Sequence, residues 1–310
     1  MVALPNIPAN ASWTQNGITV AGGHGGGSAT NQLFFALGLF VDDNQTVVIA
    51  DQFNNRIMQW KMGDNNGEVV AGGNGQGNRL DQLIHPTDVT VDKESNSFII
   101  CDSGNRRVMR WSRRSGTTQG EVFIDNVYCY GLTVDDQRNL YVCDKERYEV
   151  KRYQIGDKSV TIVAGGNGNG TGFNQLDYPS YVFVDQQQAV YVSDLTNHRV
   201  MKWNKDATEG IVVAGGRGDG TALSQLSYPN GLFVDALGSL YVADNVNDRV
   251  MRWPQGAEQG TVIAGGHGEG AGANQLYSVV GLSIDLHGNL YVVDWGNHRV
   301  QRFSIESDSI

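Results

Sequence analysis

The chain has 310 residues, of which 40% are hydrophobic and 40 are glycine, with a formal net charge of −10 and a pI near 5.0. This composition supports a sizeable core and many turns, and it excludes a disordered chain. No run of about 18 apolar residues is present, and the start "MVALPNIPANASW" lacks a basic segment followed by an apolar one, so we expect a soluble protein, with cytoplasmic and secreted locations left open. The acidic balance argues against broad electrostatic binding to nucleic acid or anionic membranes.

The first predicted strand covers residues 17–23 and runs into a glycine-rich loop, "VAGGHGGGSA" from Val20. Similar loops begin at Val70, Val163, Val213 and Ile263, and each runs on to Gln-Leu. A phosphate-binding loop needs a helix N-terminus behind its glycines, but none of these copies opens an amphipathic helix. A single nucleotide site also does not need five copies, so the recurrence indicates an internal repeat.

Six repeat units follow in chain order, and the best preserved is "YPNGLFVDALGSLYVADNVNDRVMRW", residues 228–253. The units share five marks, which are two aspartates, an arginine five residues after the second aspartate, a closing aromatic residue and short apolar runs between them. The first aspartates are Asp42, Asp92, Asp135, Asp185, Asp235 and Asp285, and the second are Asp51, Asp102, Asp144, Asp194, Asp244 and Asp294. The arginines are Arg56, Arg107, Arg199, Arg249 and Arg299, with Glu149 in the third unit, and the aromatic residues are Trp60, Trp111, Tyr153, Trp203, Trp253 and Phe303.

Runs such as "GLFVD", "LYVAD" and "RVMRW" have the length and residue types of strands and are separated by turns. Four antiparallel strands in each of six units predict an all-β, six-bladed β-propeller. The last unit ends after its third strand, "NHRVQRF", whereas "GITVAGG" at residues 17–23 has no partner strands before it. We therefore expect the N-terminal strand to complete the last blade and close the ring, which removes an exposed sheet edge. The expected organisation is an N-terminal extension over 1–16, one propeller domain over 17–304 and a C-terminal tail over 305–310.

The repeat resembles the NHL repeat, because "NHRV" occurs at Asn197 and Asn297 and "NDRV", "NNRI" and "NRRV" stand in other units. The resemblance covers nearly all of residues 17–304, and the third unit, "DKERYEVKRY", departs from the pattern. It implies a propeller but no single function, since NHL propellers include RNA binders, protein-interaction modules, extracellular sensors and a zinc-dependent amidating lyase. We expect the repeated Asp and Arg side chains to form hydrogen bonds that hold strands and blades together, and His198 and His298 to be repeat positions rather than ligands.

The repeat is broken at the start of each inner strand, which should lie beside the central channel. The two residues there are Leu37-Gly38, Thr87-Asp88, Tyr130-Gly131, Ser180-Tyr181, Asn230-Gly231 and Val280-Gly281, and the residues just upstream are Phe35, His85, Tyr128, Tyr178, Tyr228 and Ser278. Phe53 and Trp295 come from loops on the same face. The sequence therefore predicts a ligand or partner site at this channel mouth, formed by Thr87, Asp88, Tyr130, Ser180, Tyr181 and Asn230 with His85, Tyr128, Tyr178, Tyr228 and Trp295.

Our leading functional hypothesis is a non-catalytic, monomeric propeller without a cofactor or metal that binds a protein, a peptide or a small molecule at this mouth. A metal-dependent lyase or hydrolase is the first alternative. A zinc lyase needs about three convergent histidines and the sequence offers His85, while a calcium-dependent hydrolase needs several oxygen ligands and the sequence offers Asp88 and Asn230. No nucleophile with its base can be assigned.

RNA binding is the second alternative, because residues 101–152 hold ten Lys or Arg against eight Asp or Glu. The candidate basic patch is Arg106, Arg110, Arg113, Arg114, Lys145, Arg147, Lys151 and Arg152. Interleaved acidic residues weaken it, so nucleic acid is not the expected partner. The three cysteines, Cys101, Cys129 and Cys143, have no metal-ligand spacing, and we expect them to be buried packing residues rather than a disulfide framework.

Overall fold

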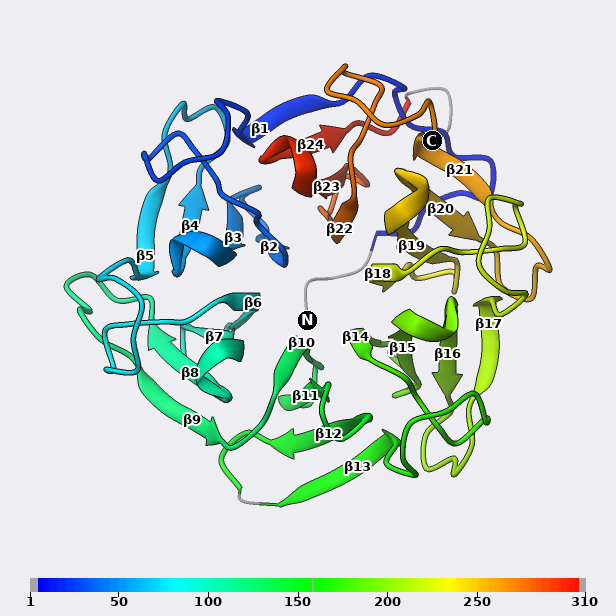
Figure 1. The fold of residues 1–310 in the computed structure, drawn as a ribbon, viewed down its shortest axis with the longest axis horizontal. Helices are drawn as coiled ribbons and strands as arrows, with labels where there is room; N and C mark the ends of the chain where they lie inside the picture. Colours follow the sequence, from blue (N-terminus) through cyan, green and yellow to red (C-terminus); the bar gives the residue numbers. More distant parts are fainter. Residues whose placement is uncertain (1–4, 158, 307–310) are drawn as a thin grey trace.

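The protein is a ring of six four-stranded antiparallel sheets around a central axis, as the computed structural model shows (Figure 1). The structure describes residues 5–157 and 159–306. Each sheet is one blade, and in five blades the strands follow one another outward from the axis in sequence order, while the outermost strand of the sixth is the N-terminal one. The six-bladed β-propeller predicted from the sequence is therefore confirmed.

The blades are numbered along the chain, and each has its inner strand first. Blade one contains β2 (Leu39–Val41), β3 (Val47–Asp51), β4 (Arg56–Trp60) and β5 (Glu68–Gly72). Blade two contains β6 (Pro86–Asp92), β7 (Ser97–Asp102), β8 (Arg107–Ser112) and β9 (Glu121–Asp125), and blade three contains β10 (Cys129–Val134), β11 (Asn139–Asp144), β12 (Glu149–Gln154) and β13 (Val160–Gly165).

The second half of the ring repeats this plan. Blade four contains β14 (Pro179–Val184), β15 (Val190–Asp194), β16 (Arg199–Trp203) and β17 (Ile211–Gly215), and blade five contains β18 (Pro229–Val234), β19 (Leu240–Asp244), β20 (Arg249–Trp253) and β21 (Thr261–Gly265). Blade six contains β22 (Val279–Ile284), β23 (Leu290–Asp294), β24 (Arg299–Phe303) and β1 (Ile18–Gly22). One-turn 3-10 helices follow the second strands of five blades, namely η1 (Gln52–Asn54), η2 (Ser103–Asn105), η3 (Leu195–Asn197), η4 (Asn245–Asn247) and η5 (Trp295–Asn297).

The N-terminal strand closes the ring, as the sequence predicts. β1 pairs with β24 in antiparallel register, with Ile18 opposite Arg302 and Gly22 opposite Arg299. Further upstream, Trp13 forms a bridge with Ile305 and its indole Nε1 donates to the carbonyl of Gly288 at 2.9 Å. Trp13 is buried, so the segment before β1 also packs onto blade six.

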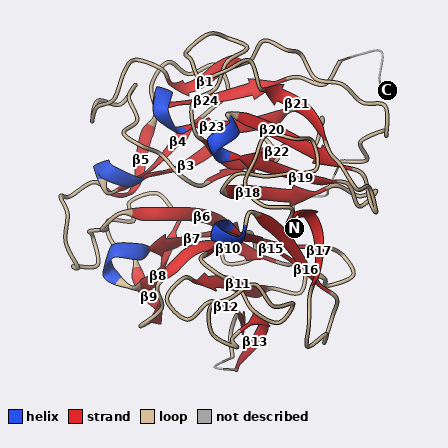
Figure 2. Cartoon of the chain, turned by 45° about the vertical axis from the view of Figure 1, so that its right-hand side comes forward, coloured by secondary structure: helices blue, strands red, loops and turns tan. Residues whose placement is uncertain are grey.

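The ring has two different faces. The helical turns and the glycine loops that connect one blade to the next lie on one face, which we call the glycine-loop face; in Figure 2 the helical turns all lie on one side of the ring. The turns between first and second strands and between third and fourth strands lie on the opposite face, which we call the hairpin face, because adjacent strands are antiparallel. Among the described residues, no helix has the length and apolarity to cross a membrane.

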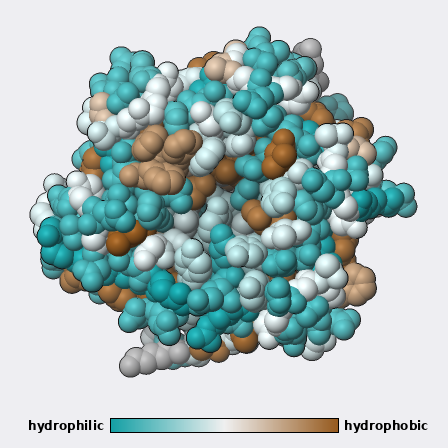
Figure 3. All heavy atoms as spheres, in the orientation of Figure 1, coloured by the Kyte–Doolittle hydropathy of each residue, from teal (hydrophilic) through white to brown (hydrophobic). Residues whose placement is uncertain are grey.

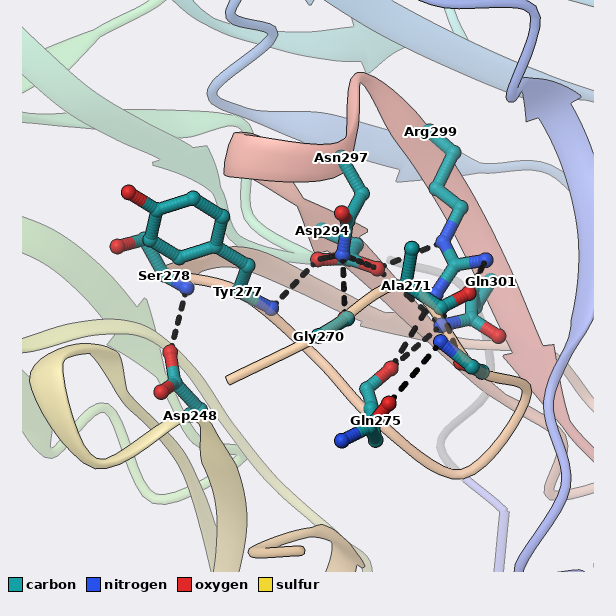
Figure 4. A network of polar contacts seen from close by, with 11 residues as sticks. Asp248, Gly270, Ala271, Gln275, Tyr277, Ser278, Asp294, Asn297, Arg299 and Gln301 are labelled. Atoms are coloured by element: carbon teal, nitrogen blue, oxygen red, sulfur yellow. Dashed lines mark hydrogen bonds and ion pairs between the residues drawn. The ribbon is translucent and has the colours of Figure 1, made fainter. Parts of the chain in front are cut away.

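The repeated Asp, Asn and Arg side chains hold each glycine loop in place, and Figure 4 shows this in blade six. The Asp294 carboxylate accepts hydrogen bonds from Arg299 Nε at 2.7 Å and from the backbone N–H of Tyr277 at 2.8 Å. The Arg299 guanidinium also donates to three carbonyl groups of the preceding loop, and Asn297 donates to a fourth, that of Gly270. Charge-assisted bonds of this kind satisfy a loop that would otherwise leave buried carbonyls unpaired.

The same arrangement, which we call the clamp, recurs in blades one, two, four and five with Nε–carboxylate distances of 2.6 to 2.7 Å. It explains why "Asp-x-x-Asn-x-Arg" recurs, and it confirms the expected hydrogen bonding by the repeated Asp and Arg residues. His198 and His298 are also structural, because each ends a helical turn in the left-handed conformation and accepts a backbone hydrogen bond, from Tyr228 and Phe35 respectively.

The junction between blades two and three is built differently. It has no glycine loop, and blade three has Glu149 in place of the clamp arginine, since there are no loop carbonyls for an arginine to bind. Instead, Cys101 of β7 and Cys129 of β10 form a disulfide with a Cα–Cα distance of 5.4 Å. The expectation that these two cysteines are only packing residues is wrong, whereas Cys143 is a buried free thiol. An odd cysteine count without regular spacing did not reveal this pair.

Apolar side chains fill the spaces between neighbouring blades. The closing aromatic residue of each third strand packs against residues of the blade before it, as Trp203 does beside Tyr141 and Val150. Trp60, Trp203, Trp253 and Phe303 are all 2% exposed or less. The blades are therefore held together by apolar burial on their faces and by clamps at one end, which leaves the inner strands to line the channel.

Candidate functional site

Six equivalent positions, one at the start of each inner strand, narrow the channel near the glycine-loop face. They are Gly38, Asp88, Gly131, Tyr181, Gly231 and Gly281. Glycine is required where neighbouring inner strands come close; a Cβ on Gly131 would clash with the carbonyl of Ser180, and one on Gly281 with that of Leu37. Only Asp88 and Tyr181 therefore project side chains from this ring of six positions.

A cavity of about 280 Å³ occupies the channel on the hairpin-face side of this ring. Asp88 and Tyr181 lie at its inner end, and all six blades contribute to its wall through the residues two positions further along each inner strand: Phe40, Thr90, Thr133, Phe183, Phe233 and Ser283. Asp92, Lys93, Glu94, Asp135, Asp136 and Arg138 line its outer end, in the hairpins of blades two and three. The cavity is thus an apolar chamber with a polar inner end and a charged mouth.

Asp88 is a buried carboxylate that has no cationic partner in the part of the chain that the structure describes. Its Oδ1 accepts the N–H of Val89 and its Oδ2 accepts the N–H of Leu132 in blade three, both at 2.9 Å. Burial raises the pKa of Asp88 to about 7, because desolvation of the charged form outweighs the two backbone hydrogen bonds. A carboxyl group that titrates near neutral pH inside a cavity is a typical feature of a functional site.

Tyr181 and Tyr130 lie next to Asp88. The Tyr181 hydroxyl is buried and has no hydrogen-bond partner among the described residues, and desolvation raises its pKa well above the ordinary value, with Asp88 adding to the effect. The Tyr130 and Tyr181 rings are in edge-to-face contact, with their centroids 6.1 Å apart. Tyr130 also packs against the core cluster formed by blades six and one. Tyr130 therefore crosses the channel on the glycine-loop side, and Lys145 lies 4.8 Å from its ring centroid.

The structure gives structural roles to three other predicted site residues. The Thr87 hydroxyl donates to the carbonyl of Cys129 in blade three, and the Ser180 hydroxyl donates to the carbonyl of Pro229 in blade five. Asn230 is buried, donates to the carbonyl of Tyr228, and has a side-chain oxygen without a partner among the described residues. None of the three lines the cavity: Thr87 and Ser180 join neighbouring blades behind it, whereas the Asn230 side chain bonds to the residue two positions before it in its own blade.

The aromatic residues predicted to surround the mouth lie on the glycine-loop face. The apolar patch over blade one in Figure 3 belongs to this face. The ring centroid of Phe35 lies 5.5 Å from that of Phe53 and 4.2 Å from that of Trp295. The ring centroids of Phe53 and His85 are 5.1 Å apart. Tyr128 lies under Arg106, and Tyr178 and Tyr228 are half-exposed. The cavity therefore opens on the face opposite to these residues, and the prediction that they bind a partner stays a prediction.

The backbone explains why several of these upstream residues differ from blade to blade. Phe35, His85, Tyr178, Tyr228 and Ser278 all have φ near +50°. The N–H of Ser278 donates to Asp248 in the blade before it, as Figure 4 shows, and the N–H of His85 donates to Asn55 in the same way. The backbone at this position links adjacent blades whatever the side chain is, so the side chain is free to vary.

The basic residues of segment 101–152 are largely paired with acidic ones. Arg106 pairs with Glu146, Arg110 with Glu121, Arg113 with Asp42, and Lys151 with Asp144 and Glu149. Arg147 lies 3.7 Å from Asp144. These ion pairs neutralise much of the positive charge of the segment, which weakens it as a phosphate-binding surface even with Arg114 and Arg152 included.

The described residues do not fit a metal site of the kind that a propeller lyase or hydrolase needs. Within residues 5–157 and 159–306, no three His, Cys, Asp or Glu side chains come together as potential ligands. His85 lies on the glycine-loop face outside the cavity, and Asp88 is the single carboxylate that the described residues place at the inner end of the cavity. A divalent cation at the inner end would thus have one protein carboxylate, where such sites use several oxygen or nitrogen ligands.

Sequence reasoning missed most of the cavity wall. Phe40, Phe183 and Phe233 lie among ordinary strand residues, Asp92 ends β6, and Arg138 lies in the hairpin between β10 and β11. One signal was present: the positions two residues after the narrow ring read Phe, Thr, Thr, Phe, Phe and Ser around the propeller. Period-2 alternation along an inner strand connects these positions to Asp88 and Tyr181.

The sequence also identifies the family. The family described as SMP-30/Gluconolactonase/LRE-like region matches residues 85–310, from the start of blade two to the C-terminus. The match covers more than half of the chain, so this protein belongs to the SMP-30/gluconolactonase-like family of six-bladed β-propellers. No curated protein matches the chain in sequence.

Solved structures share the fold at low sequence identity. An auxiliary nutrient binding protein from Bacteroides thetaiotaomicron has a TM-score of 0.72 at 14% identity, over 96% of this chain and 78% of that one. A gluconolactonase from Xanthomonas campestris has a TM-score of 0.63 at 14% identity, over 99% of both chains. A virginiamycin B lyase from Staphylococcus aureus has a TM-score of 0.60 at 12% identity, over 97% of this chain and 87% of that one. At such identities the likeness concerns the fold alone.

Proposed function

We propose that this propeller binds a small molecule in the channel cavity, entering from the hairpin face. The observation that carries this proposal is the combination of an apolar wall with two buried polar groups at its closed end, the Asp88 carboxylate and the unpartnered Tyr181 hydroxyl. Ligand pockets have this composition, in which apolar surface supplies affinity and a few polar groups fix orientation. A volume of about 280 Å³ suits a compact ligand rather than a folded protein.

The symmetry of the fold supports a functional reason for these two side chains. Four of six equivalent positions are glycine, which shows that the ring can close without side chains at this level. Burying an unpaired hydroxyl and an unpaired carboxylate costs free energy, about 1–3 kcal/mol or more for each group. A bound ligand that hydrogen-bonds to both would offset that cost.

The test is a fragment screen by ligand-observed NMR on the full chain, followed by competition in two variants. Leu232→Trp adds bulk to the cavity wall and should abolish fragment binding, while Tyr181→Phe removes only the hydroxyl and should weaken fragments that accept or donate a hydrogen bond. Phe53→Ala, on the opposite face, is the control and should leave binding unchanged. Fragments that are lost with Phe53→Ala but not with the cavity variants would refute the cavity as the binding site.

Catalysis in the same cavity is the second candidate function, and the pKa of Asp88 favours it. A carboxyl group with a pKa of about 7 can both accept and donate a proton near neutral pH, as general acid–base catalysis requires. Membership of the SMP-30/gluconolactonase-like family makes aldonolactones the first substrates to assay. Turnover that disappears in Asp88→Asn, with fragment binding retained, would favour catalysis; no turnover with binding retained would favour binding alone.

We also propose that the six units are NHL-type repeats. The clamp supports this, because the Asp, Asn and Arg residues that define "D-x-x-N-x-R" are the ones that bind the loop before each blade. The division into an extension over 1–16, a propeller over 17–304 and a tail over 305–310 remains a proposal as well. Limited proteolysis tests it, with early cleavage expected outside residues 17–304.

A further inference from the structure

The chemistry of the cavity selects one class of ligand, and we propose that it is a compact alkyl- or arylammonium cation whose charged head lies at Asp88. This inference rests on the proposed function, since it names the ligand class for the same cavity. The head group would donate to the Asp88 carboxylate and the Tyr181 hydroxyl oxygen, and the apolar body would contact the phenylalanine side of the wall.

The charge balance of the cavity favours a cationic ligand. Within residues 5–157 and 159–306, Asp88 has no cation within pairing distance, unlike the clamp aspartates, each of which has an arginine at 2.6 to 2.7 Å. Among the described residues, the cavity lining has five carboxylates, from Asp88, Asp92, Glu94, Asp135 and Asp136, and two cationic side chains, from Lys93 and Arg138. These cations are already engaged, Arg138 with Asp92 at 2.8 Å and Lys93 with Asp43 at 2.7 Å. The field along the channel is negative and attracts a cation.

The closed end of the cavity has hydrogen-bonding capacity for a further donor. Each Asp88 oxygen accepts one backbone N–H and retains a lone pair for a further donor. The Tyr181 hydroxyl has no partner among the described residues and can accept as well. An ammonium group carries three donors and no acceptor, so it matches these acceptors, whereas a carboxylate or phosphate would repel Asp88.

The wall of the cavity favours a ligand with a hydrocarbon body. Phe40, Phe183 and Phe233 come from blades one, four and five, and Leu39, Leu232, Leu282 and Ile284 line the cavity with them. Aromatic rings attract cations through their faces, and apolar contact contributes about 0.8 kcal/mol for each methylene removed from water. The ligand therefore has a hydrocarbon body as well as a charge.

The groups around Asp88 leave it as the titrating group near neutral pH. Burial raises the pKa of Tyr130 to about 12 and the pKa values of Tyr181 and Cys143 well above their ordinary ranges. Cys101, opposite Asp88 in the sheet, is in the disulfide and does not titrate. Burial lowers the pKa of Lys145, which lies beyond Tyr130 on the glycine-loop side. Cation binding should therefore follow the ionisation of Asp88.

The experiment measures binding of three probes of equal length to the full chain: hexylamine, hexan-1-ol and hexanoate, by calorimetry or NMR titration at pH 8. We expect hexylamine to bind about tenfold or more tightly than hexan-1-ol, as one charge-assisted hydrogen bond provides, and hexanoate to bind least. Asp88→Asn should remove the preference for the amine over hexan-1-ol. Glu121→Gln, which removes a carboxylate on the outer strand β9, is the matched control and should retain the preference.

The pH dependence of the unmodified protein provides a second measurement if Asp88→Asn does not fold. Alkylammonium groups resemble lysine and stay protonated below about pH 10. The affinity for hexylamine should therefore rise about tenfold or more between pH 5.5 and pH 8, while the affinity for hexan-1-ol stays constant.

The outcomes separate the two levels of the proposal. Equal affinities for hexylamine and hexan-1-ol, or an amine preference that survives in Asp88→Asn, would overturn the ammonium assignment and leave the cavity as a binding site. If none of the three probes binds and the fragment screen also fails, the proposed small-molecule function is wrong as well. Preference for hexanoate would overturn the charge argument directly.

Discussion

Five junctions between neighbouring blades are built from a glycine loop and a clamp, while the junction between blades two and three is built from a disulfide and a buried carboxylate. In the five regular junctions every clamp carboxylate is paired with an arginine, and the loop carbonyls are satisfied by the same side chain. In the irregular junction Cys101–Cys129 links β7 to β10, and Asp88 accepts the N–H of Leu132 across the same boundary. Both solutions join adjacent blades, but only the second leaves a carboxylate without a cation.

The difference indicates where function can arise in a symmetric scaffold. In a clamp, the arginine and aspartate charges neutralise each other, so the five regular junctions leave no clamp carboxylate for a ligand. Where the loop is missing, Asp88 replaces a glycine and faces the cavity.

Opening the whole ring should cause the largest loss of stability. Deleting residues 1–23 removes β1 and leaves the edge of β24 unpaired in blade six. We expect the truncated chain to lose its cooperative thermal unfolding transition, measured by calorimetry or circular dichroism, because every blade depends on its neighbours for its core. A melting transition like that of the full chain would contradict the closure of the ring by β1.

Breaking one regular junction should be the next largest effect. Arg249→Met leaves the buried Asp244 and the loop carbonyls of Thr221, Ala222 and Gln225 without their donor, at a cost of about 3–5 kcal/mol in the free energy of unfolding. Glu149→Met is the matched change in blade three and should cost less free energy of unfolding, because the Asp144 carboxylate keeps its ion pair with Lys151 Nζ at 3.0 Å. Denaturant titration measures the free energy of unfolding of both variants. Equal costs would show that the clamp arginine stabilises its junction no more than Glu149 stabilises blade three.

Breaking the irregular junction should cost about 3 kcal/mol. The disulfide closes a loop of 28 residues, and its removal in the Cys101→Ala/Cys129→Ala double variant returns that entropy to the unfolded chain. Unfolding in denaturant with and without reductant measures the effect, and the reduced parent protein should match the double variant. Cys143→Ala should remain as sensitive to reductant as the parent, since Cys143 is a free thiol.

The smallest effect is a change in pH dependence at Asp88. Its pKa is raised from 3.8 to about 7, so the folded state binds the proton more tightly than the unfolded state. The stability from this group is therefore fully present below about pH 4 and is lost progressively as the pH rises from about 4 through 7. Asp88→Asn removes this loss. Relative to the parent, the variant should gain about 2 kcal/mol between pH 5 and pH 8.

Thermal unfolding of the parent and Asp88→Asn across this pH range measures the gain. Asp244→Asn, at a clamped carboxylate, is the comparison and should lower stability because it breaks the pair with Arg249. Parallel pH profiles for the parent and Asp88→Asn would show that Asp88 titrates normally and is not a buried, unpaired carboxylate.

Much of the fold could be predicted from the repeat because repetition averages out local ambiguity. The aspartate and arginine marks placed six units in register, and the missing fourth strand at one end matched the extra strand at the other. The clamp was predicted in kind, since charged residues that recur with a structure usually stabilise it. Its partners, the loop carbonyls, were not predicted, because carbonyl groups leave no mark in a sequence.

The candidate site was predicted only in part. Asp88 and Tyr181 were recognised because they replace glycines of the repeat, and the structure places both in the cavity. Thr87, Ser180 and Asn230 share the same irregular positions, but Thr87 and Ser180 bond to neighbouring blades and Asn230 bonds within its own blade. No sequence pattern distinguishes a hydroxyl that bonds a neighbouring strand from one that faces a channel. The pairing of Cys101 with Cys129 likewise depends on two strands of different blades lying side by side.

The sequence by itself determined the all-β class, the six units, the closure of the ring and the two unusual residues at its narrowest point, because these follow from local periodicity and from departures from a repeat. The tertiary structure decided on which face the cavity opens, which polar groups are already satisfied, and how blades two and three are joined. These properties depend on distances between strands that are remote in the chain and on the burial of individual atoms. For Asp88 in particular, the amino acid is visible in the sequence, but its proton affinity near neutral pH arises only when six inner strands close around it and exclude water.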